Sequence, residues 1–364
     1  MSNSEPTPYT IDVPDQELAD LRARLAATRW PDAVADDWSR GVSPSALRAL
    51  IERWIDGYDW RATEKRLNQL EHYKLDGLHF VRAGTRGKPP LLLLHGWPDS
   101  FLRFEKILPL LEDDFDLVVP SIPGFGLSDR PETPGVGAAR TADLFAGLME
   151  RLGLTRYGIH GGDCGGQIGE AMARRHGEHV TGLHLTDLPF WHTFVDPSTL
   201  DPAEQEFLQQ AQDWAQREGA YLMEQTSKPQ TLSYGLNDSP AGLAAWIFEK
   251  YQSWSDGDAV TALGTDAILD NLPLYWVTQT GPTSVRYYFE NFTTISEIMS
   301  QPPATVPTAY AHFPGDHQHP PRSFVERSLN LKHWAEMPSG GHFTAWEAPQ
   351  PLADDLRTFF RDRS

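Results

Sequence analysis

Short continuous apolar runs recur along the chain from about residue 73 onward. After YKLDGLHFVRAG, whose pattern predicts a hairpin, turn residues bound six such runs: PPLLLLHGW (89–97), FDLVVPSIPGFG (115–126), RYGIHGGDCGG (156–166), VTGLHLTDLP (180–189), VPTAYAHFPGD (306–316) and LKHWAEMPSGGH (331–342). A strand that is buried on both faces of a sheet has this pattern. Because helical segments separate the runs, we expect an α/β fold with a mostly parallel, doubly wound sheet.

Two regions depart from this alternation. The pattern of residues 1–72 predicts helices and loops. Apolar residues stand at helical spacing in two segments, ELADLRARLAATRW (17–30) and SPSALRALIERWIDGYDW (43–60). Residues 190–303 predict helices rich in aromatic side chains: AEQEFLQQAQDWAQREGAYLMEQ, PAGLAAWIFEKYQSW and AILDNLPLYWVTQ. We therefore expect three parts, namely an N-terminal extension (1–72) wrapped on the core, a core (73–189 and 304–364) and a helical lid (190–303).

Composition narrows the class of partner. The 364 residues carry a formal net charge of −19, which argues against nucleic acid or an anionic membrane as a partner. The N-terminal residues show no basic start followed by an apolar run, and no stretch approaches the ~18–20 apolar residues of a membrane span. The single cysteine excludes an intrachain disulfide and fits a reducing compartment, so we expect a cytoplasmic protein without a membrane partner.

The segment GGDCGGQ (161–167) offers two candidate nucleophiles. A nucleophile on a sharp turn from strand to helix needs small residues two positions before and two positions after it. Asp163 and Cys164 both satisfy this rule, by the glycine pairs 161/165 and 162/166 respectively. An aspartate would form an alkyl ester with an electrophilic carbon, whereas a cysteine would form a thioester with a carbonyl substrate.

The register of this turn favours Asp163. The second and third residues after the nucleophile should be small, because the helix starts close to the sheet. If Asp163 is the nucleophile, these residues are Gly165 and Gly166. Cys-Gly-Gly-Gln instead puts the bulky Gln167 at the second of these positions. The other interpretation of Asp163, as a simple helix cap, does not account for glycines on both flanks.

An aspartyl ester needs a base that activates water, and an acid that orients the base. His342 follows the last predicted strand in PSGGHFTAWE, and Asp316 follows the strand before it in FPGD. The chain order of nucleophile, acid and histidine is that of a known hydrolase architecture. A loop aspartate is often an ordinary turn residue, and Asp187, after the strand that follows the turn, is a competing candidate for the acid.

The loop HGWP (95–98) follows an apolar strand at the expected edge of the sheet. We expect an oxyanion to be held by the backbone N–H groups of Trp97 and Cys164. The run GDHQH contains His317 and His319, but two histidines without further ligands are a weak metal signal. We therefore expect neither a metal nor another cofactor.

With these motifs the sequence resembles the microsomal-type epoxide hydrolases of the α/β-hydrolase superfamily. ATRWPD and GYDWRATEKRLNQ resemble the N-terminal extension of that group, and HGWPDS, PSIPGFGLSD and GGD resemble its core signatures. REGAYLMEQTSKPQTLSYGLNDSPAGLAAWIFEKYQSW and VRYYFEN are similar to its lid, and FPGD with GGHFTAWEAP completes the match. The resemblance runs nearly end to end.

The resemblance implies an α/β-hydrolase fold and a set of roles. Asp163 matches the nucleophile, His342 the general base and Asp316 the orienting acid, while Tyr221 and Tyr288 match the lid pair that hydrogen-bonds the epoxide oxygen. Two features depart from the group. Cys164 stands where Trp is common, and Asp316 is one methylene shorter than the usual Glu. We also expect no counterpart of the membrane anchor of the mammalian members.

Two other functions share some of these features. A haloalkane dehalogenase would use the same aspartyl ester but would hold the halide with N–H groups. The Cys164 side chain cannot supply such a group, whereas the Trp97 ring can. A non-catalytic ligand-binding protein of this fold would need neither the triad nor the phenols. We therefore expect an epoxide hydrolase that makes a vicinal diol from an apolar or aromatic epoxide. Three questions stay open: which epoxide is the substrate, whether the role is detoxification or secondary-metabolite biosynthesis, and whether the protein is a homodimer.

Overall fold

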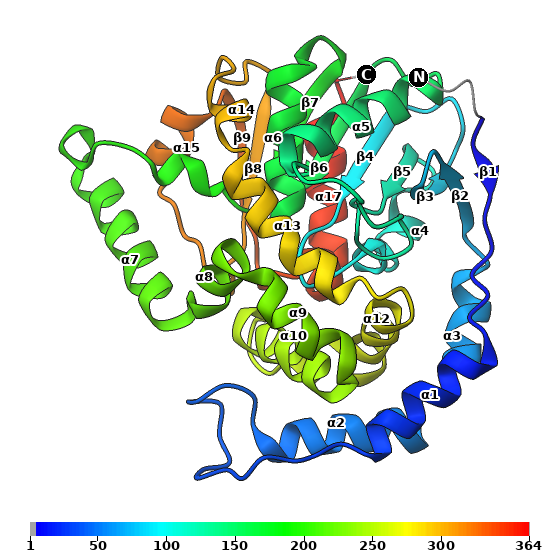
Figure 1. Cartoon of the computed structure of the whole chain (residues 1–364). Coiled ribbons are helices and arrows are strands. Elements are labelled where there is room, and N and C mark those ends of the chain that lie inside the picture. Colours follow the sequence, from blue (N-terminus) through cyan, green and yellow to red (C-terminus); the bar gives the residue numbers. More distant parts are fainter. Residues whose placement is uncertain (1–4, 364) are drawn as a thin grey trace.

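A nine-stranded sheet lies at the centre of the part of the chain, residues 5–363, that the computed structural model describes (Figure 1). The strands follow the spatial order β1-β2-β3-β5-β4-β6-β7-β8-β9. Their bounds are β1 Thr7–Pro8, β2 Glu71–Leu75, β3 Leu78–Gly84, β4 Pro90–Leu94, β5 Asp116–Pro120, β6 Tyr157–Gly161, β7 Val180–Leu185, β8 Thr308–His312 and β9 Leu331–Glu336.

The six predicted apolar runs are strands β4 to β9, and all pairings among them are parallel. The predicted hairpin is the antiparallel pair β2 and β3, and β3 pairs antiparallel with β5. The parallel sheet expected from the sequence is therefore confirmed. Since parallel strands share one carboxyl edge, the loops after β4, β6, β7, β8 and β9 open on the same side of the molecule.

Helices cover both faces of the sheet, and Figure 1 shows α5, α6 and α17 beside it. The helices of the core are η1 Phe101–Phe104, α4 Leu108–Leu111, α5 Ala138–Arg151, α6 Cys164–Arg175, η2 Gly177–His179, α15 Arg322–Ser328, α16 Thr344–Glu347 and α17 Pro349–Phe360. Buried side chains of the strands fill the centre, among them Leu91 to Leu93 of β4, which are fully buried.

The segment between β7 and β8 is helical, as its aromatic, strand-free pattern predicts. Its helices are η3 Phe190–Thr193, η4 Pro197–Thr199, α7 Pro202–Glu218, α8 Ala220–Ser227, α9 Pro229–Asp238, α10 Pro240–Trp254, α11 Ala259–Leu263, α12 Thr265–Val277, α13 Gly281–Thr293 and α14 Ser296–Met299. The stretch that was expected to be one helix breaks at Gly219, which ends α7 and precedes α8. The domain boundaries at residues 72, 189 and 303 stay predictions.

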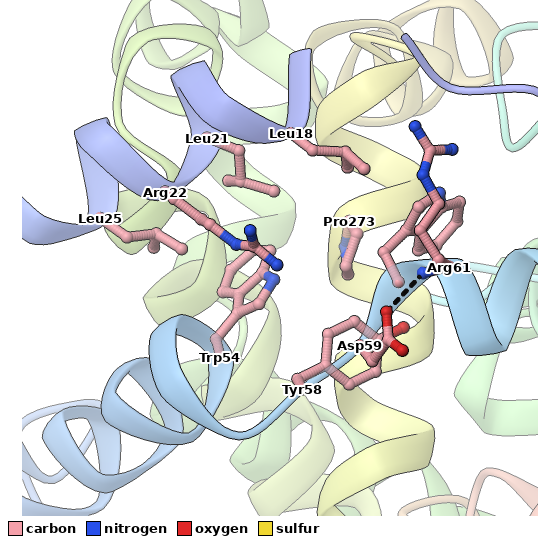
Figure 2. A pocket seen from close by; sticks show the side chains of 10 residues that line it. Leu18, Leu21, Arg22, Leu25, Trp54, Tyr58, Asp59, Arg61 and Pro273 are labelled. Carbon is pink, nitrogen blue, oxygen red and sulfur yellow. Dashed lines mark hydrogen bonds between the residues drawn. The ribbon is translucent and has the colours of Figure 1, made fainter. Parts of the chain in front are cut away.

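The N-terminal extension contains α1 Asp15–Ala26, α2 Pro44–Asp56 and α3 Trp60–Leu67. Ser43 caps α2, because its side chain accepts a hydrogen bond from the Ala46 N–H. Figure 1 shows α1 and α2 on the side of α10 and α12 that faces away from the sheet. A pocket at this junction is lined by Leu21 of α1, Trp54 of α2 and Pro273 of α12, among others (Figure 2).

The sequence interpretation was wrong in one respect here. Residues 1–72 were expected to hold helices and loops, yet β1 adds an edge strand to the sheet by pairing with β2. Two residues are too short to show an alternating pattern, and Pro8 is compatible with an edge strand. Of the helices in residues 5–363, none has the length and apolarity that crossing a bilayer requires.

Candidate active site

Asp163 occupies the turn between β6 and α6. Its backbone has φ 53° and ψ −131°, a conformation that residues other than glycine seldom adopt. Cys164, by contrast, is the first residue of α6. The exposed, strained apex of a strand–helix turn is where this architecture holds a nucleophile, so the backbone favours Asp163.

The glycines around this turn discriminate between the two candidates. A Cβ on Gly161 would lie 2.5 Å from the carbonyl carbon of Gly165, and a Cβ on Gly165 would lie 2.1 Å from the Leu94 carbonyl oxygen. Backbone cannot yield to such contacts, so the pair that flanks Asp163 must be glycine. A Cβ on Gly162 would instead meet the Thr186 hydroxyl, which belongs to a side chain.

Cys164 is a poor nucleophile in this position. Its side chain is buried, and burial, with a further contribution from the nearby Asp163 carboxylate, raises the pKa of the thiol well above its usual value. The reactive form of cysteine is the thiolate. A neutral, buried thiol therefore fits packing and not attack.

The Trp97 N–H donates a hydrogen bond of 2.8 Å to Oδ1 of Asp163. The loop that carries Trp97 is tight, because a Cβ on Gly96 would lie 2.5 Å from the same oxygen, and the Gly96 N–H is held by Oδ1 of Asp99 at 2.9 Å. Trp97 thus lies where the sequence places the first oxyanion donor. Within residues 5–363 no hydrogen bond joins the Cys164 N–H to the Asp163 side chain, and its role as second donor stays a prediction.

His342 lies between Asp163 and Asp316. Its Nδ1 donates to Oδ1 of Asp316 at 3.2 Å, and its Nε2 faces Oδ2 of Asp163 at 3.8 Å. The second distance is too long for a direct hydrogen bond. Both His342 and Asp316 are buried, with 1 % and 6 % of their surface exposed.

The charges of this group are strongly coupled. Burial alone would lower the pKa of His342, but the carboxylates of Asp316 and Asp163 outweigh burial and raise the pKa to about 9. Burial alone would raise the pKa of Asp316, but His342 and His317 outweigh it and hold the pKa well below the usual range. Asp316 is therefore ionised at neutral pH and stabilises the imidazolium form of His342.

The competing acid, Asp187, lies under the turn. Its Oδ2 accepts the Asp163 N–H at 2.8 Å, and no hydrogen bond among the described residues joins it to His342. Burial, above the other contributions, raises the pKa of Asp187 to about 6. Asp187 thus holds the backbone of Asp163, whereas Asp316 contacts His342.

Two lid phenols converge over the loop of Trp97. The Tyr221 ring, from α8, stacks on the Trp97 ring with 5.4 Å between centroids, and the Tyr288 ring, from α13, packs edge-on at 5.7 Å. The two phenol rings are 6.2 Å apart. Burial, and then the Asp163 carboxylate, raise the pKa of both phenols well above 10, so both retain their protons at neutral pH.

Comparison with known proteins identifies the family of the chain. The profile described as "Epoxide hydrolase N terminus" matches residues 6–104, and the profile of the alpha/beta hydrolase fold matches residues 89–234. A provisionally named epoxide hydrolase of Stigmatella aurantiaca (strain DW4/3-1) is 40% identical, over 98% of this chain and 84% of its own length. The chain belongs to the epoxide hydrolase family.

More distant members of the family extend the match. Epoxide hydrolase 1 of Sus scrofa is 33% identical over 97% of this chain and 88% of its own length. The crystal structure of juvenile hormone epoxide hydrolase from the silkworm Bombyx mori superposes with a TM-score of 0.89 at 30% identity, covering 99% of this chain and 95% of that one. The expected α/β-hydrolase fold and the expected family are therefore confirmed.

Several residues of this epoxide hydrolase site escaped the sequence interpretation. Arg103, buried and paired with Asp99 at 2.6 Å, donates a hydrogen bond to the backbone carbonyl of His342. The His342 N–H donates to the Trp254 carbonyl at 2.9 Å, so the last residue of α10 also positions His342. HGWPDS offered Asp99 as a signal, but neither spacing nor pattern relates Arg103 to a loop 239 residues later.

His317 and His319 do not converge on a common point. His317 donates its backbone N–H to Asp316 at 2.7 Å and has Nδ1 2.9 Å from the same carboxylate oxygen, whereas His319 lies beside His312. Asp316, His317 and His342 have potential ligand atoms within 4.8 Å of one another. Because Asp316 and His342 already hydrogen-bond each other, their pairing accounts for the closeness of this group, and the absence of a metal stays a prediction.

Proposed function

We propose that this chain opens an epoxide through a covalent ester on Asp163 and hydrolyses the ester with a water molecule activated by His342. The observation that carries the proposal is the arrangement around one carboxylate. The Trp97 N–H binds Oδ1, which leaves Oδ2 facing His342 on one side, while the two lid phenols pack on Trp97.

In the first step, Oδ2 of Asp163 attacks a ring carbon of the epoxide from the side opposite the breaking C–O bond. The oxygen that leaves becomes an alkoxide on the same molecule, so it needs a donor that can approach proton transfer. Tyr221 and Tyr288 are neutral phenols and supply this donor pair. Oδ1 becomes the ester carbonyl oxygen and stays bound to the Trp97 N–H.

In the second step, His342 takes a proton from water, and the resulting hydroxide attacks the ester carbonyl carbon. Asp316 stabilises the imidazolium that forms. The oxyanion develops on Oδ1 against the Trp97 N–H, with the Cys164 N–H as the proposed second donor. Collapse releases a vicinal diol with inversion at the attacked carbon and restores the Asp163 carboxylate.

We also propose that the epoxide is apolar or aromatic. The rings of Tyr221, Trp254 and Tyr288 all contact the ring of Trp97, whose backbone N–H binds the Asp163 carboxylate, and aromatic faces favour apolar substrates. A homodimer and a cytoplasmic location stay predictions; the single, buried Cys164 is consistent with a reducing compartment.

A substrate panel tests this function. Styrene-type, aliphatic and polycyclic epoxides are scored for diol and enantiomer, and matched haloalkanes are scored for halide. We expect diol from the aromatic epoxides at the highest rate, with no loss of activity in a chelator. Halide release faster than diol formation would favour the dehalogenase alternative, and loss of activity in the chelator would require a metal.

A further inference from the structure

Lys250 on α10 is a buried cation with no part in the proposed mechanism. Only 5 % of its surface is exposed, and its ion-pair partner is the neighbouring Glu249, whose Oε2 lies 2.5 Å from Nζ. Glu249 reaches solvent, with 20% of its side chain exposed. Burying an ammonium group costs free energy unless its surroundings compensate, so the position of Lys250 calls for a reason.

The Lys250 ammonium lies over the ring of Tyr221, with Nζ 4.7 Å from the ring centroid. This distance is within the range of a cation–π interaction, and Trp254 is a second, more distant ring at 5.9 Å. Among the described residues, a Lys side chain, that of Lys250, lies over the Tyr221 ring, whereas no Arg or Lys lies over the Tyr288 ring. The two phenols that face Asp163 therefore differ in their electrostatic surroundings.

This difference matters when the epoxide opens. A phenol that gives its proton to the alkoxide gains negative charge, and that charge spreads into the ring. A cation over the ring stabilises the charged form more than the neutral form, which lowers the barrier and not merely the energy of the bound substrate. The carboxylates of Asp163 and Glu249 act in the opposite direction on Tyr221. The Lys250 ammonium over the ring opposes their effect by Coulomb attraction to the phenolate.

We propose that Lys250 is a positioning residue for epoxide opening: its ammonium group favours the charged form of Tyr221, and so makes Tyr221, not Tyr288, the phenol that transfers its proton. The proposal rests on the proposed function. The C–O bond of the epoxide breaks as the Oδ2–C bond to Asp163 forms, and the Tyr221 proton moves to the alkoxide oxygen. Ester hydrolysis leaves a proton on His342, which returns through solvent to the Tyr221 phenolate and closes the cycle.

The test measures ester formation in a single turnover at saturating epoxide, by rapid quench and mass of the Asp163 peptide. Lys250→Met should form the ester ~10-fold more slowly, a value between the effects of an exposed and a fully desolvated cation–π contact. Lys250→Arg should recover most of the rate, because it keeps a cation. The apparent substrate dissociation constant and the rate of ester hydrolysis should stay within about twofold in both, since the effect is confined to proton transfer.

Two tyrosine backgrounds separate this role from a structural one. With Tyr221→Phe there is no phenol for Lys250 to act on, so Lys250→Met should have no further effect; with Tyr288→Phe the ~10-fold loss should persist. Equal losses in both backgrounds, or an unchanged rate in Lys250→Met, would overturn the proposal.

If Lys250→Met does not fold, the variant Glu249→Gln tests the role instead. Removal of the counter-charge should keep or raise the rate of ester formation, and a loss comparable to ~10-fold would contradict the role. Absence of any Asp163 adduct in the parent protein would contradict the proposed function instead.

Discussion

The turn at Asp163 and the lid position their residues in different ways. At the turn, backbone geometry decides: a Cβ on Gly161 or Gly165 would meet backbone atoms, a Cβ on Gly96 would meet the Asp163 side chain, and Asp163 itself has a positive φ. In the lid, Tyr221, Lys250 and Tyr288 come from three helices and meet only through packed side chains. We infer that the core fixes the covalent chemistry, while the lid adjusts how easily the epoxide oxygen leaves.

We expect His342→Gln to separate ester formation from ester hydrolysis most clearly. The base acts on water and not on the epoxide, so ester formation should continue while hydrolysis slows by ~10⁴-fold or more, as in other triads that lose their histidine. Mass spectrometry of the denatured protein should show substrate attached to the peptide that contains Asp163. An inactive variant without an adduct would mean that His342 is also needed for attack.

Asp316→Asn should slow the same step by up to ~10⁴-fold, the size found when the acid of a serine-protease triad is neutralised. The amide cannot stabilise the imidazolium, whereas ester formation needs no such charge. Asp187→Asn is the matched control, because it changes a buried carboxylate that contacts the Asp163 N–H. If Asp187→Asn slows hydrolysis more than Asp316→Asn does, the acid is Asp187.

The lid should show the opposite pattern. Tyr221→Phe and Tyr288→Phe should each slow ester formation by about 30- to 1,000-fold, corresponding to ~2–4 kcal/mol for one donor to a developing charge. The double variant should be nearly inactive on epoxides, with the ester, once formed, hydrolysed normally. Tyr287→Phe is the control, since this buried phenol packs on Phe125 and not on Trp97. A double variant that opens epoxides near the parent rate would remove the lid from the mechanism.

The pH dependence of ester hydrolysis should depend on the electrostatic interaction between His342 and the Asp163 carboxylate. The pKa of His342 is raised to about 9, in part by the Asp163 carboxylate. Esterification neutralises that carboxylate, so the imidazolium loses a partner and its pKa falls. Because only the neutral imidazole accepts a proton, the hydrolysis rate should rise with pH to a plateau whose midpoint lies below 9. A rate that falls with pH in stopped-flow measurements on pre-formed ester would contradict this.

The smallest effect is expected from Cys164→Ser. The side chain is buried beside Asp163 and contributes no chemistry in our account, so both rate constants should stay within about tenfold of the parent. Thermal unfolding monitored by circular dichroism would separate a packing defect from lost chemistry. Complete loss of activity in a folded variant would return the question of the nucleophile to Cys164.

The two regions also differ in how far the sequence predicts them. The strands and the triad candidates were predictable because continuous apolar runs and glycine pairs impose local constraints, and the parallel sheet brings the loops after β6, β8 and β9 to one edge. Tyr221 and Tyr288 came only from the resemblance. Arg103 and Lys250 were missed, because their contacts depend on packing between different segments, which leaves no periodic signal in the sequence.

Oxygen labelling in a single turnover tests the central claim, the Asp163 ester, most directly. Excess enzyme reacts with a good epoxide substrate in water enriched in ¹⁸O, and the diol is analysed by mass spectrometry. We predict an unlabelled diol in the first turnover, because its new oxygen comes from the Asp163 carboxylate, and one ¹⁸O in the Asp163 peptide afterwards. A diol that is fully labelled in the first turnover would show direct attack by water and contradict the account.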